Sequence, residues 1–452
     1  MPARNIFSGQ ATPLPPLPPV PFAMARAGSR SATRLAGVLA FALVLGGCYD
    51  QPTEPVAESD DRAIVTSDEG ALADRVRYPE EDVPVDAPVP NAFAAALVDG
   101  PALAPSAIEL VLRTEIDVPD VNGLLPQATS ISRRGNNSFL VSYNVRGDVF
   151  LGGIDYVANL LGRYPLVLSS VILLDSDVSA VALDGSTLYA AQATDASGFA
   201  TPAAVERLSF TFFGISLQQG MRADLSSFAA TSVTPVGNVV YVTTGDDGHL
   251  YALDAADFSV LRQYPLAAAP WVEYDEAGGR FVVVQGTPGR ISIFEEGSFP
   301  GGSMQLLNTF PFPGADVPES KSAMDIAGGK AFIAAGPEGV QIMCLDNGDI
   351  VGSVPRPDPA ALGLDPDVVV TNAVTADEDL MFISNGEAGV YAAAGEDAWA
   401  DTACDAPQDI SVLGRLRFSA LQSANHVDYR NKVLAVAAGL GGVKIVRVSI
   451  RN

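Results

Sequence analysis

A short strand–turn–strand sequence recurs in the C-terminal part of the chain and most constrains what it can fold into. The three clearest copies are KAFIAAGPEGVQIM at residues 330–343, MFISNGEAGVYAA at residues 381–393 and LAVAAGLGGVKIV at residues 434–446. Apolar residues alternate on both sides of a glycine turn, which predicts two short strands joined tightly. A repeat at intervals of about 50 residues indicates an array of similar units that pack on one another.

Weaker copies extend the array toward the N-terminus. Aligned on the first turn glycine or the residue in its place, the seven copies are centred on Val145, Ala193, Gly245, Gly286, Gly336, Gly386 and Gly439. A short alternating strand precedes each copy, as in NAVTAD at 372–377, and another follows most copies, as in DIVGSVPRP at 349–357. Units of four short strands are typical of β-propeller blades. The sequence therefore predicts an all-β, seven-bladed β-propeller over residues 106–452.

The two ends of the array predict how the ring closes. The chain stops after the third strand of the seventh unit (VKIVRVSI, 443–450), so that unit lacks an outer strand. The segment AIELVLRTEIDV at 107–118 reads as a strand that belongs to no unit. Placed as the missing outer strand, it closes the ring and leaves no seam of unpaired backbone groups.

The clearest units resemble a known repeat family. FIAAGPEGVQIMCLD at 332–346 and LAVAAGLGGVKIVRVS at 434–449 look like LVIVD repeats, which are related to YVTN-type propellers of bacterial surface proteins. The resemblance covers residues 107–452 and is strongest from Gly237 onward. It implies a secreted or surface propeller with no defined activity. The WD dipeptide, the Asp-box of sialidases and the tryptophan-docking pattern of quinoprotein propellers are absent from the sequence.

Residues 1–47 read as a secretory signal. Three arginines lie between Met24 and the apolar run LAGVLAFALVL at 35–45, which is too short to span a bilayer. The Leu-Gly-Gly-Cys that ends at Cys48 resembles the bacterial lipobox, in which the cysteine receives a diacylglycerol group. The resemblance implies a lipid-anchored protein of the bacterial cell envelope, at the outer membrane or cell surface, with Met24 as the true start. The alternative is an ordinary signal peptide with a chance cysteine.

Residues 48–105 are predicted to form a flexible tether between the lipid anchor and the propeller. This stretch is rich in Pro, Ala, Asp and Glu and poor in aromatic residues, as in QPTEPVAESDD at 51–61. Such a composition buries too little apolar surface to offset the entropy of ordering, and proline and like charges extend the chain. We therefore expect the segment to hold the propeller away from the membrane.

The net charge limits the choice of partner. The chain has 27 Lys plus Arg against 53 Asp plus Glu, for a formal net charge of −26. A field of that sign repels phosphate backbones, so no nucleic-acid partner is expected. A solvated acidic surface is the simpler interpretation of the charge. No cofactor is expected, although the acidic turns at 246–247 and 377–379 leave calcium open without matching a known calcium loop.

Two cysteines remain besides Cys48. Cys344 ends the third strand of the fifth unit, and Cys404 lies in an insertion after the third strand of the sixth. Beyond an oxidising membrane two cysteines tend to pair, and neighbouring blades can bring these two together. The alternative is two independent buried thiols. No metal site is predicted, because two cysteines lack the further ligands of a closed site.

One position of the innermost strands predicts a site at the channel mouth. It holds a small polar residue in six units, namely Thr129, Ser179, Thr231, Ser322, Asn372 and Asn425. The fourth unit has Val272 there, beside Trp271. The innermost strands of a propeller begin around one mouth of the channel, so we expect a polar ring with Trp271, Lys321 and His426 at its edge. The other interpretation is that these side chains hydrogen-bond backbone between blades.

Chemistry at this ring is weakly supported. The only histidines are His249, in a turn, and His426, and no HExxH motif is present. Because the ring lacks paired carboxylates, it suits a sugar or peptide better than bond cleavage. We expect a binding or scaffolding module for an envelope or extracellular protein or a glycan, more than an enzyme.

Two alternatives stay open. One is a hydrolase or lyase that acts on a glycan or lactone in the channel, with His426, Asp325 and Asp428 as candidate acid and base groups. The other is a structural component of the envelope that meets membrane proteins along blade edges. A scaffold of either kind is expected to use a loop patch such as the one around Trp399.

Overall fold

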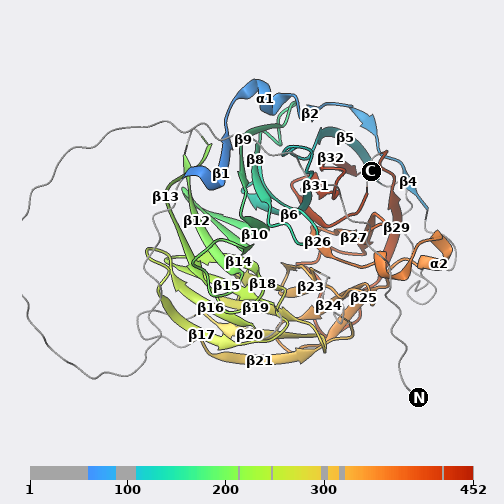
Figure 1. Ribbon diagram of the computed structural model, residues 1–452. Coiled ribbons are helices and arrows are strands. Elements are labelled where there is room, and N and C mark those ends of the chain that lie inside the picture. The colour runs from blue at the N-terminus through green and yellow to red at the C-terminus, as the bar shows by residue number, and fades with distance from the viewer. Residues whose placement is uncertain are drawn as a thin grey trace, which may run out of the picture. The chain divides into compact units, whose positions relative to one another are not determined.

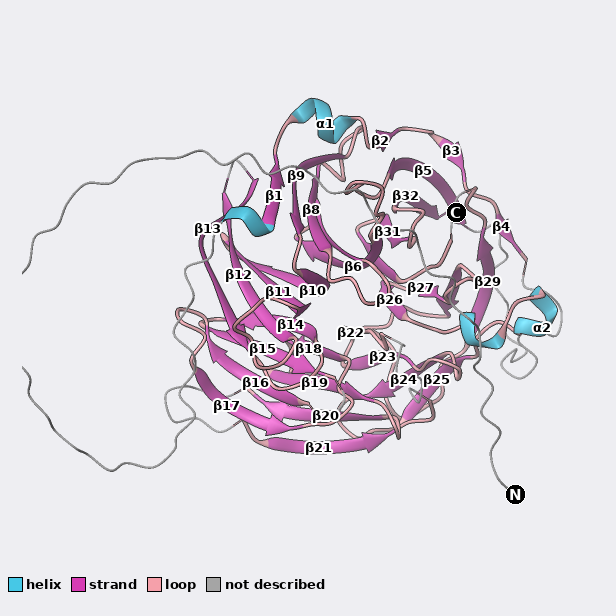
Figure 2. Cartoon of the chain, viewed as in Figure 1, coloured by secondary structure: helices cyan, strands magenta, loops and turns pink. Residues whose placement is uncertain are grey.

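Seven antiparallel sheets in a ring make up the described part of the chain (Figure 1). The computed structural model describes residues 60–87, 108–211, 214–245, 248–296, 304–314, 321–419 and 422–450. Helices in these residues are short, such as α1 (Glu69–Ala73) and α2 (Pro359–Leu362), and strands dominate (Figure 2). None of these helices has the length and apolar character needed to cross a membrane. The prediction of an all-β, seven-bladed β-propeller is confirmed.

Each blade contains four antiparallel strands, with the first nearest the centre of the ring (Figure 1). Blades 1 to 3 contain β6 (Gln127–Arg134), β7 (Ser138–Asn144), β8 (Gly152–Ala158) and β9 (Leu166–Leu173); β10 (Ser176–Asp184), β11 (Thr187–Thr194), β12 (Ala203–Thr211) and β13 (Gly214–Asp224); β14 (Ala230–Val236), β15 (Val239–Thr244), β16 (His249–Asp254) and β17 (Val260–Pro265). Blades 4 and 5 contain β18 (Trp271–Asp275), β19 (Arg280–Gln285), β20 (Arg290–Glu295) and β21 (Leu306–Pro311); β22 (Met324–Ala327), β23 (Lys330–Ala334), β24 (Val340–Cys344) and β25 (Ile350–Val354). Blades 6 and 7 contain β26 (Ala373–Asp377), β27 (Leu380–Ser384), β28 (Val390–Gly395) and β29 (Ile410–Leu416); β30 (His426–Arg430), β31 (Val433–Ala437), β32 (Val443–Ile450) and β5 (Ile108–Ile116).

The repeated glycine turn joins each of the last three blades to the next one. Gly336, Gly386 and Gly439 all adopt φ near +60°, where a side chain is unfavourable. Their carbonyl groups accept hydrogen bonds from the start of the following innermost strand, as Gly439 does from the amide of Ala128 at 3.1 Å. The repeat therefore supplies both the turn within a blade and a contact between blades.

The ring closes through a strand from each end of the propeller sequence, as predicted. Strand β5 pairs antiparallel with β32 along nearly its whole length. Lys444 faces Glu115 across this seam, and its Nζ lies 2.6 Å from the Glu115 carboxylate. Burial opposes ionisation of Glu115, but the ammonium of Lys444 and the guanidinium of Arg77 hold its pKa below the usual value. The seam is thus held by the pairing of β5 with β32 and by a buried ion pair.

Residues 60–87, here called the strap, correct the tether prediction. Strand β1 (Ala63–Thr66) pairs with β9, β2 (Val76–Arg77) and β3 (Glu81–Asp82) pair with β5, and β4 (Val85–Asp86) pairs with β29. The strap therefore runs along the outer edges of blades 1, 7 and 6. Its backbone finds ladder partners there, and Leu72 and Val83 become buried. The rest of the predicted tether, the signal segment and Cys48 lie outside the described residues.

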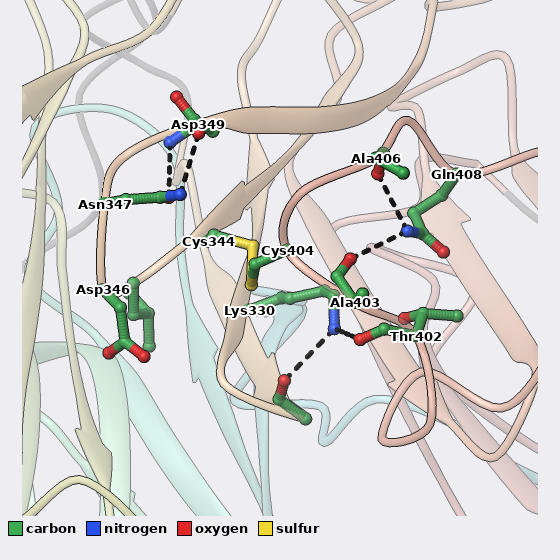
Figure 3. The surroundings of a disulfide bond; sticks show 12 residues. Lys330, Cys344, Asp346, Asn347, Asp349, Thr402, Ala403, Cys404, Ala406 and Gln408 are labelled. Atoms are coloured by element: carbon green, nitrogen blue, oxygen red, sulfur yellow. Dashed lines mark hydrogen bonds between the residues drawn. A yellow bond between two sulfur atoms is a disulfide. The ribbon is translucent and has the colours of Figure 1, made fainter.

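The structure joins Cys344 and Cys404 in a disulfide, with Cα atoms 5.8 Å apart (Figure 3). The bond ties blade 5 to the insertion of blade 6. Beside it, the buried Lys330 ammonium donates to the carbonyl groups of Trp399 and Thr402 at 3.0 and 2.7 Å. Trp399 is only 1% exposed, so it packs inside this insertion and is not the surface contact that the sequence suggested.

Candidate ligand site in the central channel

The predicted polar ring is largely occupied by contacts between blades. Four of its side chains donate to a backbone carbonyl of the following blade. The bonds join Thr129 Oγ1 to Val178 O (3.4 Å), Thr231 Oγ1 to Ala269 O (2.8 Å), Asn372 Nδ2 to Ala424 O (3.3 Å) and Asn425 Nδ2 to Ala128 O (2.8 Å). Ser322 is 1% exposed, and Ser179 contributes its carbonyl oxygen to Lys321. This geometry favours the interpretation that the ring binds backbone.

A cavity of about 460 Å³ lies one residue further along the same strands. Its lining comes from the first strand of every blade and includes Trp271 and His426, two of the residues predicted for the channel. The ionisable side chains that line it are Arg133, Glu273, Glu276, Asp325, His426, Asp428 and Arg430. The structure thus brings together Asp325, Asp428 and His426, the candidate acid and base groups.

Two of these carboxylates have cationic partners. Asp428 pairs with Arg133, which reaches it from blade 1. Asp325 lies 3.6 Å from an Arg430 nitrogen, and its Oδ2 also accepts hydrogen bonds from Thr375 Oγ1 and the Ala376 amide. Burial still raises the pKa of Asp325 above its usual value. Both carboxylates therefore serve contacts between blades as well as facing the cavity.

Glu273 is different, and sequence reasoning missed it. Its Oε2 accepts a hydrogen bond from Trp271 Nε1 at 3.1 Å, and no ion pair of this carboxylate occurs within the described residues. Burial, and then the negative charge of Asp325, raise the pKa of Glu273 to about 7. Its spacing from Trp271 was the available signal, because residues two apart in a strand point to the same face.

His426 and Lys321 lie toward the predicted mouth. The His426 ring is 5.5 Å from that of Trp271, and its buried Nδ1 has no hydrogen-bond partner in the part of the chain that the structure describes. Burial and the charge of Lys321 lower the pKa of His426 to about 3, so the ring is neutral at physiological pH. Lys321 donates to Ser179 O at 3.1 Å, linking blades 5 and 2, and burial lowers its pKa to about 7.

The donor set has no arrangement suited to a metal ion. The described residues contain no group of three or more His, Cys, Asp and Glu side chains that is placed to hold one. His249, expected as a solvated turn residue, is the first residue of β16 and packs 5.4 Å from the ring of Tyr251. The lining of the channel cavity combines charged and aromatic side chains.

Comparisons with known proteins add little beyond the fold. No protein-family model matches the sequence, and no curated protein does, so the resemblance to LVIVD repeats stays a prediction. Among solved structures, the WD40 β-propeller domain of Doa1 aligns with a TM-score of 0.49 at 10% identity, over 74% of this chain and 95% of that one. The computationally designed Ika8 protein aligns with a TM-score of 0.43 at 10% identity, over 82% and 98%. The blade topology itself supports a binding or scaffolding module.

Proposed function

We propose that this protein is a lipid-anchored propeller of the cell envelope that binds a ligand, from a partner protein or a glycan, in its central channel. The observation that carries the proposal is the cavity of about 460 Å³ that Trp271, Glu273 and His426 line. Small-molecule sites commonly have volumes of about 300–1,000 Å³ and a few convergent polar groups.

The anchoring part of the proposal is supported by sequence. The apolar run before Cys48 and the Leu-Gly-Gly-Cys sequence resemble a lipoprotein signal. The disulfide between Cys344 and Cys404 is consistent with an oxidising compartment. A net charge of −26 disfavours binding to nucleic acid and leaves proteins, glycans and cations as ligands.

A hydrolase or lyase is the second candidate, favoured by one observation. Glu273, with a pKa of about 7, and Asp325 face the same cavity as the neutral His426. A group whose pKa lies near the working pH is suited to general acid–base catalysis. Turnover of a glycan or lactone that is lost in Glu273→Gln would establish this activity, whereas unaltered substrate in the wild type would exclude it for the compounds tried.

The first test is crosslinking on intact cells, followed by identification of what is captured. Wild type is compared with Cys48→Ser, which removes the predicted anchor, and with Trp271→Ala, which alters the channel. We expect one dominant envelope partner that is lost in both variants. A partner that survives Trp271→Ala would place binding on the blade edges. The absence of any captured partner, with the protein confirmed at the membrane, would overturn the scaffold.

A further inference from the structure

Among the charged side chains that line the channel cavity, Glu273 has no ion pair within the described residues. We propose that the cavity binds a small molecule carrying an ammonium group, with Glu273 as the counter-ion and the Trp271 ring as an aromatic wall. The proposal rests on the channel-binding function above and names its ligand class. It follows from three features of the cavity: a carboxylate without an ion pair, an aromatic side chain beside it and a neutral histidine in the same lining.

The first feature is the carboxylate of Glu273. Arg133 pairs with Asp428 and Arg430 with Asp325, so Glu273 has no ion pair within the described residues, although the charge of Arg430 partly offsets the rise of its pKa. The one hydrogen bond that the structure shows for the Glu273 side chain comes from the neutral indole of Trp271. A partly buried carboxylate without an ion pair is costly, and a ligand cation at that position offsets the cost.

The aromatic wall is held in place for such a ligand. Trp271 packs against hydrophobic clusters of the neighbouring blades, and its Nε1 is fixed by Glu273. An ammonium group beside Glu273 therefore lies near the edge of the indole, and the rest of a ligand in the cavity can pack against the ring. Glucose-like neutral polyols also stack on tryptophan, but they leave the charge of Glu273 uncompensated.

The neutral histidine is His426. The residue lines the same cavity, with the ring 5.5 Å from that of Trp271, while its Nδ1 is buried away from the cavity. An ammonium group donates three hydrogen bonds, so it can bond to Glu273 and to a further acceptor in the cavity lining. A cationic imidazole would repel this ligand, but burial keeps the pKa of His426 near 3.

Binding of this ligand depends on pH. An ammonium ion favours the ionised form of Glu273, so affinity is expected to rise as pH increases toward and past 7. The other charged groups that face Glu273 are Asp325 on β22, Asp428 and Arg430 on β30, Arg133 on β6 and Glu276 after β18. Lys321 loses its proton in the same range and strengthens the trend, so a Glu273 variant is needed to separate the two.

The test is isothermal titration calorimetry on the purified full-length protein. Two amines, putrescine and glucosamine, represent aliphatic and sugar sources of the ammonium group, and butane-1,4-diol and glucose are their neutral counterparts. We expect at least one amine to bind and its counterpart not to bind. Titration in two buffers of different ionisation enthalpy at pH 7 should show release of about half a proton per site, because Glu273 is then about half protonated.

Variants assign the effect to the channel. Glu273→Gln should weaken amine binding by at least about tenfold, because it removes the counter-ion. Glu295→Gln, an exposed carboxylate in β20 of the same blade, should bind as the wild type does. Circular dichroism establishes that both variants fold, and proton release that is lost in Glu273→Gln is assigned to Glu273 and not to Lys321.

Several results would overturn the ligand class: no binding of either amine, equal binding of amine and alcohol, no proton release, or unchanged affinity in Glu273→Gln. These failures differ from failure of the proposed function. If the amines fail but capture of a partner in cells still depends on Trp271, then only the ligand class is wrong. If no partner is captured either, the channel-binding function falls with it.

Discussion

Two carboxylates at the rim of this propeller and one in its channel, Glu273, meet different surroundings. At the rim, Asp155 is fully buried, accepts the Arg75 guanidinium at 2.6 Å and also bonds to Tyr143 Oη at 2.7 Å. Glu206 is likewise fully buried and pairs with Arg62. Both arginines belong to the strap. In the channel, Glu273 accepts a hydrogen bond from the neutral indole of Trp271 and has no ion pair within the described residues.

This difference distinguishes carboxylates that stabilise the fold from a carboxylate that is available to a ligand. A buried carboxylate and its cation balance each other only when both are present, so the rim pairs make the strap part of the folded propeller. Glu273 carries its desolvation cost without that balance. Such a cost is typical of functional sites, where a perturbed pKa marks a group kept for binding or chemistry.

Removing the strap should have the largest effect. A chain that begins at residue 88 leaves Asp155 buried without its cation, at about 3–5 kcal/mol, and also removes Arg62 from Glu206. We expect its free energy of unfolding to fall by more than about 5 kcal/mol relative to a chain that begins at residue 59. Urea denaturation followed by circular dichroism measures the difference. Equal midpoints for the two chains would mean that the strap is only an attachment.

Arg75→Met should destabilise the protein by about 3–5 kcal/mol, because Asp155 then lacks its cation. Adding Asp155→Asn, which removes the stranded charge and keeps an acceptor for Tyr143, should restore most of the loss. The three variants and the wild type form a double-mutant cycle in urea. A double variant as unstable as Arg75→Met would show that shape, not charge, holds the strap.

Glu273→Gln should increase the free energy of unfolding, by less than Arg75→Met decreases it. The folded-state pKa of about 7 lies above the usual carboxyl value, so wild-type stability is full below pH 4.5 and falls as pH rises toward 7. Glutamine does not ionise, so the variant should gain about 1–3 kcal/mol at pH 8 and almost nothing at pH 4.5. Urea unfolding at both pH values measures this. A loss of stability at pH 8 would mean that Glu273 is paired in solution.

Arg77→Met should have the smallest effect among these changes. Arg77 also belongs to the strap, but its side chain is 53% exposed where it meets Glu115 and Asp117. Exposed ion pairs contribute about 0–1 kcal/mol and weaken with salt. We expect a loss below about 1 kcal/mol that disappears in 1 M sodium chloride. A loss as large as that of Arg75→Met would show that exposure does not separate the two arginines.

The fold was readable from local patterns, while the site was only partly so. The glycine repeats and the strand-like segment at 107–118 predicted the blades and the closing strand, because alternation and turns depend on near neighbours in sequence. The channel residues Trp271 and His426 were found from their register. Glu273 was missed because its isolation depends on Arg133 and Arg430 being engaged elsewhere, which no pattern within β18 indicates.

The strap shows a second limit of prediction from local sequence. Its composition resembles that of a flexible segment, and local reasoning assigned it no structure. Its partners, Asp155 and Glu206, lie in blades 1 and 2, about 80 and 144 residues away along the chain. Ordering of residues 60–87 is favourable only because the assembled ring presents open strand edges and buried carboxylates to it.

By itself, then, the sequence determined the number and kind of the blades, since period-two alternation and glycine turns act over a few residues. Tertiary structure alone decided which charged groups are satisfied. A carboxylate in this protein is neutralised or left unpaired according to what the neighbouring blade places within about 4 Å of it, and electrostatic energy in a buried site depends on that distance. The contrast between Asp155 and Glu273 exists only in the closed ring.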